Sequence, residues 1–409
     1  MKRREFITLL GGVAAMPFAA NAQQPMSASA IDEQMRRAVE RKDVAGVVVM
    51  AADRKGVIYQ GAFGVADIGE ARPLKMDSLF RIASMTKAVT STAAMQLVEQ
   101  GRFAIEDPVE KYLPQFAKLS VFESFDGATG AYRVRPATKL VTIRHLLTHT
   151  SGLGYAFTNP IVRDFKPRAG EDYPVGPLVF EPGERWLYST STDWLGRLVE
   201  KVSGLSLEDY FRQRIFTPLG MADTFYFVPK EKEPRLVTVN RRLADGSLVK
   251  DSAQPPTSGF TPIGGGGLSS TAGDYIRFTR ALLNGGELDG GRVLSAGTVT
   301  LMGQNHIGAI GVPAQKTAMP ERSDDFSFIA DGRDKWGLGF LITADAVAGK
   351  RSAGSLSWGG INNTYYWLDP SRGITGVILM QFLPFADHKA LALYDTFERG
   401  VYQIADASR

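Results

Sequence analysis

A serine and a lysine stand three residues apart in a helix-prone stretch, FRIASMTKAVTSTAAMQLVEQG, residues 80–101. Residues at i and i+3 share one face of a helix, so Ser84 and Lys87 can meet. A serine hydroxyl becomes an effective nucleophile when a base takes its proton, and a partly buried lysine can be that base. The spacing is equally compatible with a helix-capping serine and a solvated lysine, so the stretch alone leaves both interpretations open.

The same spacing recurs at Ser247 and Lys250. Ser247 follows an Asp245-Gly246 turn and opens an extended stretch, SLVKD. Side chains at i and i+3 of a strand point to opposite faces, so these two groups cannot meet. We therefore predict a surface position for Ser247, and helical context favours Ser84 as the nucleophile.

Other patterns with possible chemistry are weaker. His145 and His149 have metal-ligand spacing, but the glutamate of H-E-x-x-H and a third ligand are missing, which favours two structural histidines and no metal. No Gly-x-Ser-x-Gly occurs, so the nucleophile elbow of a Ser-His-Asp hydrolase is absent. The four glycines 264–267 precede no Lys-Ser/Thr pair, so a flexible loop is predicted there rather than a phosphate-binding loop.

Strand patterns lie at both ends of the chain, with helical patterns between them. A helix over 31–42 precedes strands over 44–53 and 57–66, and further strands begin near residue 336. A helix closes the chain. The pattern predicts an α+β fold, an antiparallel sheet flanked by helices, with a mostly helical domain inserted. The expected parts are a leader over 1–22, an N-terminal α/β part over 23–83, a helical domain over 84–305 and C-terminal strands and helix over 306–409.

The first 22 residues, MKRREFITLLGGVAAMPFAANA, have the grammar of an export signal. A positive start, an apolar middle and an Ala-x-Ala site predict cleavage, and the paired arginines resemble a twin-arginine signal. An ordinary Sec signal is the alternative. The expectation is a periplasmic or secreted bacterial protein without a stable membrane anchor after signal removal.

Composition removes several functional classes. The chain of 409 residues has a formal net charge of only +4 and no basic run or zinc-finger spacing, so nucleic acid is not an expected partner. It has no cysteine, which excludes disulfides and thiol chemistry. A hydrophobic content of 44% is ordinary for a globular protein.

Several longer stretches carry a family resemblance. They are FRIASMTKAVTSTAAMQLVEQGRFAIEDPVEKYLPQF, VTIRHLLTHTSGL, PGERWLYSTSTDWLGRLVEKVSGL, GGGLSSTAGDYIRF and WGLGF, in this order. Together they resemble the serine β-lactamase-like superfamily of penicillin-recognising enzymes, and within it class C β-lactamases and family VIII carboxylesterases. The resemblance spans roughly residues 31–405 and implies the β-lactamase-like fold.

The resemblance assigns roles to three residues. Ser84 would be the acyl-accepting nucleophile and Lys87 its partner. The family's Tyr-x-Asn motif corresponds to Tyr188-Ser189-Thr190, so Tyr188 would be the shared general base. Tyr155, which follows HTSGLG, is expected to line the same cleft.

The third family motif departs from the lactamase pattern. Lys-Thr-Gly is replaced by Trp358-Gly359-Gly360, which resembles the esterase branch. The lost lysine would meet a substrate carboxylate, whereas tryptophan offers an apolar face and one N–H donor, which favours a neutral ester. The two glycines would let substrate approach the strand. The backbone N–H groups of Ser84 and Ile361 would form the oxyanion hole.

These inferences predict an exported serine hydrolase that cleaves short-chain carboxylic esters through an acyl-enzyme on Ser84, without metal or organic cofactor. The partner is a small-molecule ester. A β-lactamase or D-amino-peptidase of the same fold remains an alternative, as does a non-catalytic penicillin-recognising binding protein. Acyl transfer to an alcohol also fits the scaffold.

Overall fold

A single antiparallel sheet joins the two ends of the chain. The computed structural model describes residues 27–327 and 332–407, so the expected export signal over 1–22 lies outside the described residues. The strands run in the order β12-β13-β14-β15-β16-β1-β2-β3. They are β1 (Gly46–Asp53), β2 (Val57–Asp67), β3 (Arg72–Pro73), β12 (Lys335–Trp336), β13 (Leu341–Ile342), β14 (Leu356–Gly360), β15 (Thr364–Asp369) and β16 (Ile374–Leu379). The antiparallel sheet expected from the sequence is confirmed.

The seam between the two ends lies at the centre of the sheet. β1 pairs with β2 on one side and with β16 on the other, where Val48 lies opposite Leu379. β1 and β16 are buried along almost their whole length. This burial explains why the sequence of β1 is a continuous apolar run rather than an alternating one. The sheet therefore needs helices on both faces.

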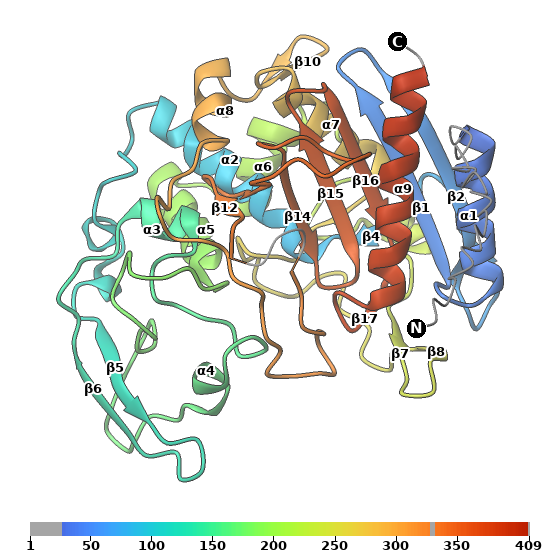
Figure 1. The fold of residues 1–409 in the computed structure, drawn as a ribbon. Coiled ribbons are helices and arrows are strands. Elements are labelled where there is room, and N and C mark those ends of the chain that lie inside the picture. Colours follow the sequence, from blue (N-terminus) through green and yellow to red (C-terminus); the bar gives the residue numbers. More distant parts are fainter. Residues whose placement is uncertain (1–26, 328–331, 408–409) are drawn as a thin grey trace, which may run out of the picture.

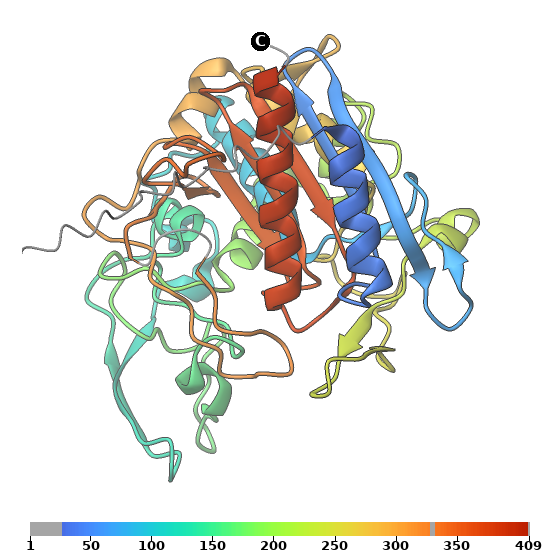
Figure 2. The same cartoon turned by 45° about the vertical axis from the view of Figure 1, so that its right-hand side comes forward.

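Those helices come from distant parts of the chain. α1 (Ala28–Glu40) and α9 (His388–Ala407) lie side by side on one face, whereas α2 (Thr86–Glu99) and α7 (Ala272–Leu283) lie on the other (Figures 1 and 2). Beyond α2 lies the remaining, mainly helical part of the molecule. Its helices are α3 (Ile143–Thr148), α4 (Pro160–Asp164), α5 (Ser191–Ser203), α6 (Leu207–Phe211), which continues as a π-helical turn (Arg212–Phe216), and α8 (Ala296–Met302).

Short strands and turns complete the fold. The two-residue pairs are β4 (Phe80–Arg81) with β9 (Ser269–Ser270), and β10 (Glu287–Leu288) with β11 (Gly291–Arg292). A small sheet holds β17 (Phe382–Leu383), β7 (Asn240–Arg242) and β8 (Leu248–Lys250). β5 (Ser120–Phe125) and β6 (Tyr132–Pro136) form a hairpin. The 3-10 turns are Ala83–Met85, Val109–Lys111, Pro114–Phe116 and Lys230–Arg235.

The β5–β6 hairpin departs from the mostly helical domain predicted over 84–305. Its turn carries Asp126 and Gly130, and its strands carry Phe122, Phe125 and Tyr132, whose rings pack edge to face. These are ordinary hairpin residues. They were not predicted as strands because the sequence stretches before and after the hairpin have helical patterns.

Among the described residues, no helix combines the length and the apolar character needed to cross a membrane.

A buried ion pair fastens α9 to the segment that precedes β14. Arg351 donates from Nε to Glu398 Oε1 at 2.7 Å and from an Nη to Glu398 Oε2 at 2.8 Å, and its side chain is 2% exposed while that of Glu398 is fully buried. Lys350 approaches the same carboxylate at 3.2 Å. Since β14 follows this segment, the pair helps to fix the strand that carries the Trp358 motif.

Removal of one partner should be costly because the other charge stays buried. We predict that Glu398→Ala lowers the free energy of unfolding by about 3–5 kcal/mol, measured by urea denaturation. Glu33→Ala, which breaks the exposed Glu33–Arg37 pair on α1, is the matched control and should change it little. Equal effects of the two substitutions would contradict this account.

Candidate active site

Ser84 lies at an abrupt turn from extended chain to helix. β4 ends at Arg81, and Ile82 N–H still donates to Leu268 O at 3.0 Å. Ala83 then adopts φ +45°, a left-handed conformation that costs a residue with a side chain about 1–2 kcal/mol. A 3-10 turn over Ala83–Met85 leads directly into α2. The strained residue thus immediately precedes the predicted nucleophile, a position where strain is often stored in functional sites.

α2 is buried on all sides, which removes Lys87 from solvent. Lys87 is 2% exposed, and its neighbours on the helix are alanine, valine, threonine and serine. The small side chains let α5 and the sheet approach α2 closely. The solvated-lysine interpretation is therefore wrong, since a buried charge needs partners inside the protein.

Three acceptors surround the Lys87 amine. Nζ lies 3.2 Å from Ser84 Oγ, 3.1 Å from the Tyr155 hydroxyl and 2.7 Å from Gly265 O. An ammonium group has three N–H donors and no acceptor, so this arrangement uses all of them. Ser84 and Lys87 meet, as their helical spacing predicts.

Tyr188 also contacts Lys87, from the loop before α5. Lys87 Nζ is 4.8 Å from the centre of the Tyr188 ring, a cation–π distance. The Trp358 indole N–H donates to the Tyr188 hydroxyl at 3.3 Å. This hydrogen bond and the Lys87 contact fix the Tyr188 phenol in the site.

His149 supports the Tyr188 loop. It terminates α3 in a left-handed conformation, φ +56°, which ends the helix at Thr148. Its ring lies 5.0 Å from that of Tyr188, and its Nδ1 is 3.0 Å from Ser189 Oγ. Burial, and then the charge of Lys87, lower the pKa of His149 well below its usual value, so the imidazole stays neutral.

His145 has a separate structural task. Its Nδ1 accepts from Thr142 N–H at 3.1 Å, and Thr142 caps the helix in return. Burial lowers its pKa to about 4. Among residues 27–327 and 332–407, no group of three or more His, Asp or Glu side chains is placed to hold a metal ion.

The Trp358-Gly359-Gly360 stretch runs along β14 beside Ser84. A Cβ on Gly360 would lie 2.3 Å from Ile82 O and one on Gly359 would lie 2.7 Å from the Tyr365 ring, so only glycine fits at either position. A small hollow joins five of the predicted residues with two aromatic side chains that sequence reasoning missed, whereas Tyr155 lies against Lys87 and does not line it. The hollow is lined by Ser84, Tyr188, Trp358, Gly359, Ile361, Phe157 and Phe385.

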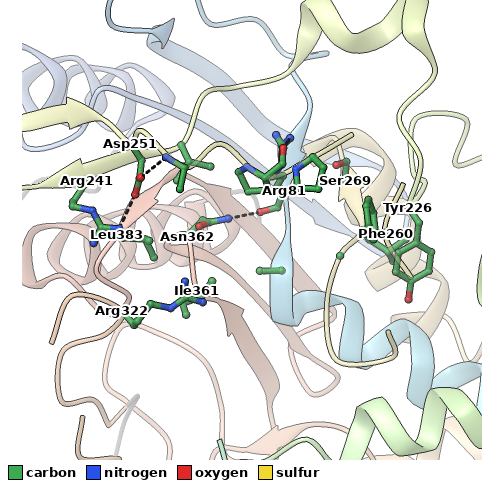
Figure 3. Close-up of a pocket in the computed structure, with 17 residues that line it drawn as sticks. Arg81, Tyr226, Arg241, Asp251, Phe260, Ser269, Arg322, Ile361, Asn362 and Leu383 are labelled. Carbon is green, nitrogen blue, oxygen red and sulfur yellow. Dashed lines mark hydrogen bonds and ion pairs between the residues drawn. The ribbon is translucent and has the colours of Figure 1, made fainter. Parts of the chain in front are cut away.

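A larger pocket opens beside this hollow. It encloses about 360 Å³ and shares Ile361 with the hollow, while Ala83 places it next to Ser84. Figure 3 shows Arg81, Arg241 and Arg322 around it, with Tyr226 and Phe260 at its far side. Arg241 contacts Asp251 at 2.7 Å. Within the described part of the chain, Arg81 and Arg322 form no ion pair, so the lining carries an excess of positive charge.

Comparison with known proteins identifies the family of this chain. The sequence model of the Beta-lactamase family matches residues 31–398. The chain belongs to the Beta-lactamase family. Its fold is the β-lactamase-like fold, as the sequence resemblance implied, and its relatives include proteins named as acyltransferases and as an esterase.

Two relatives and one solved structure show which activities are named among the proteins similar to this chain. Monacolin J acid methylbutanoyltransferase of Aspergillus terreus is 32% identical over 400 residues, covering 91% of this chain and 95% of the relative. Lovastatin esterase of Penicillium rubens is 30% identical over 395 residues, covering 91% and 98%. The solved structure of simvastatin synthase (LovD) from Aspergillus terreus, in its LovD6 mutant form, superposes with a TM-score of 0.80 at 30% identity, covering 95% and 97%.

The indole N–H of Trp358 offers a direct test of the site. Trp358→Phe keeps an aromatic ring but removes the donor to Tyr188, so we predict a fall in kcat of about 10²-fold or more, measured with a short-acyl nitrophenyl ester. Trp367→Phe is the matched control, because the buried Trp367 indole nitrogen has no hydrogen-bond partner in the described structure. A Trp358→Phe enzyme as active as the Trp367→Phe enzyme would refute the role of this hydrogen bond.

Proposed function

We propose that the protein is a serine hydrolase that cleaves short-chain carboxylic esters through an acyl-enzyme on Ser84. The observation that carries this proposal is the placement of Lys87 Nζ, buried and 3.2 Å from Ser84 Oγ, beside the Tyr188 ring. An amine in this position stabilises negative charge on Tyr188 and on the serine oxygen as the proton moves. The proposal includes the assignment of this protein to the family VIII carboxylesterases.

The acylation step follows from the order of these groups. Tyr188, as phenolate, takes the proton from Ser84 while Oγ forms a bond to the acyl carbon. The backbone N–H groups of Ser84 and Ile361 would stabilise the resulting oxyanion. The carbon–oxygen bond to the alcohol then breaks, and the alcohol leaves with the proton from Tyr188. Water attacks the acyl group in the same way and releases the acid and Ser84.

The lining of the hollow supports an ester rather than a lactam substrate. Trp358 replaces the lysine expected to meet a lactam carboxylate, and its single N–H is already directed to Tyr188. Phe157 and Phe385 add apolar surface to the lining of the hollow. The hollow beside Ser84 is narrow, which suits a short acyl chain.

Mass spectrometry after incubation with a nitrophenyl ester tests the covalent mechanism. We expect an acyl mass increase on the peptide that carries Ser84, and loss of both adduct and turnover in Ser84→Ala, by about 10³-fold or more. Ser247→Ala is the matched control: Ser247 has the same spacing to a lysine, but it is exposed and Lys250 contacts Asp67 at 2.8 Å instead. Full activity in Ser84→Ala would overturn the mechanism and favour a binding protein.

A β-lactamase or D-amino-peptidase is the remaining alternative within this mechanism. It predicts faster turnover of a chromogenic cephalosporin or a D-amino-acyl amide than of the nitrophenyl ester. That ranking of rates, measured with the same preparation, would replace the esterase assignment while leaving the role of Ser84 intact.

The arginine-lined pocket favours a second activity, acyl transfer to an alcohol that carries a carboxylate. Arg81 donates to Pro255 O but to no carboxylate in the described residues, and burial lowers its pKa. A desolvated cation without a counter-ion favours an anionic ligand. The names of two relatives, a monacolin J acid and an ML-236A carboxylate methylbutanoyltransferase, point in the same direction.

A pair of acceptors that differ only in charge tests this activity. We predict that the enzyme transfers an acyl group faster to a hydroxy acid than to the methyl ester of the same hydroxy acid. Arg322→Gln should reduce this preference by about tenfold, the effect of losing one charged hydrogen bond. Arg163→Gln, at an exposed pair with Asp164, is the control. Equal rates with both acceptors in the unmodified enzyme would contradict an anion-binding pocket.

A further inference from the structure

The four-glycine stretch 264–267 is part of the active site rather than a flexible spacer. Gly265 O accepts from Lys87 Nζ at 2.7 Å, and Gly265 N–H donates to Asp193 Oδ1 at 2.7 Å. Gly265 therefore links Lys87, through its carbonyl group, to the Asp193 carboxylate, through its N–H group. Next to it, Gly264 O accepts from Thr90 on α2 at 2.7 Å, which fastens the loop to the helix that carries Ser84.

Only glycine allows this contact. A Cβ on Gly265 would lie 2.4 Å from Asp193 Oδ1 and 2.8 Å from the Tyr155 hydroxyl. A Cβ on Gly264 would lie 2.1 Å from Thr192 O. Both distances are far below van der Waals contact, so any side chain here would separate the loop from α5. The absence of side chains on the two glycines lets the loop lie against the first turn of α5.

Asp193 reaches Lys87 by a second route. Tyr155 OH accepts from Lys87 at 3.1 Å, and the only acceptor that the described structure offers to the Tyr155 proton is Asp193 Oδ2, at 3.5 Å. The Lys87–Tyr155–Asp193 chain and the Lys87–Gly265–Asp193 chain together close a ring around the amine. Lys87 is the cation and Asp193 the anion of this ring.

The charges around this ring are few. Burial raises the pKa of Asp193, while the charge of Lys87 and the donors Gly265 N–H and Tyr155 OH act against that rise. Burial, and then the charge of Asp193, raise the pKa of Tyr155 well above its usual value, so Tyr155 stays a neutral phenol. Arg197 on α5 and the buried Tyr226 are the other titratable groups that interact with Asp193. Tyr188 interacts with Tyr155 and contacts Lys87, and His149, which is neutral, interacts with Lys87.

From this arrangement we propose that Asp193 is a positioning residue for the acyl-transfer chemistry. It holds Lys87 as an ammonium group against Ser84, through the Gly265 backbone and the Tyr155 hydroxyl. Tyr155 is thereby committed to Asp193 as a donor, which leaves Tyr188 as the tyrosine available to take the serine proton. The inference rests on the proposed function, because it concerns the same nucleophile.

The rate at which a fluorophosphonate labels Ser84, measured from pH 6 to 10, tests this role without depending on an ester substrate. Asp193→Asn keeps an acceptor for Gly265 N–H but removes the negative charge that faces the Lys87 amine across the ring. We expect the alkaline limb of the labelling profile to move to lower pH by about one unit, a difference worth about 1.4 kcal/mol. The melting temperature should change little.

Tyr155→Phe and the double variant separate the two routes. Tyr155→Phe should move the alkaline limb in the same direction. Since both residues act through Lys87, the double variant should move it by less than the sum of the two single shifts. Asp289→Asn, which changes an exposed acid paired with Arg277, is the control and should leave the profile unchanged.

Failure of the Asp193 role and failure of the proposed function give different labelling results. An unmoved alkaline limb in Asp193→Asn, with Ser84 still labelled in the unmodified enzyme, would overturn the role of Asp193 and leave the proposed function standing. Absence of Ser84 labelling in the unmodified enzyme at every pH would instead overturn the proposed function.

Discussion

A buried lysine controls the architecture of this protein around its site. Moving an ammonium group out of water is costly unless its donors find acceptors, so Lys87 requires partners from several parts of the fold. They come from the turn at Ser84, from Tyr155 after α3 and from Gly265 before α7. The segments that must meet here are far apart in sequence. Their meeting at one amine explains why α2, α5 and the glycine loop pack so closely.

The seam between the chain ends and the Lys87 site are connected through Arg81 and Gln381. The Gln381 side chain accepts from Arg81 N–H at 2.8 Å, just before the strained turn at Ala83. Gln381 follows β16, the strand that pairs with β1. The position of the nucleophile therefore depends on the central strands of the sheet as well as on its own helix. Strain at Ala83 can persist because these contacts hold both sides of it.

Sequence reasoning could find what local rules determine. Helical periodicity brought Ser84 and Lys87 together, β-type runs at both ends gave the antiparallel sheet, and the motif around Tyr188 placed that residue near them. It could not find Asp193 or Gly265, because an acid in the first turn of a helix and a glycine in a loop are ordinary features there. Their relation to Lys87 exists only once α5 and the loop have packed. The same limit applies to the pocket, whose arginines come from three separate segments.

The order of the strands has a consequence for how the molecule is made. β1 and β2 are synthesised early, but β16, which pairs with β1 at the centre of the sheet, is separated from it by more than three hundred residues. Such long-range pairing slows folding, because the entropy of closing the chain is lost before the contacts form. Until the last strands emerge, one edge of β1 stays open and Arg81 lacks the glutamine that orients it. A chain that stops short of β16 would thus carry the complete set of Ser84, Lys87 and Tyr188 and still have no assembled site.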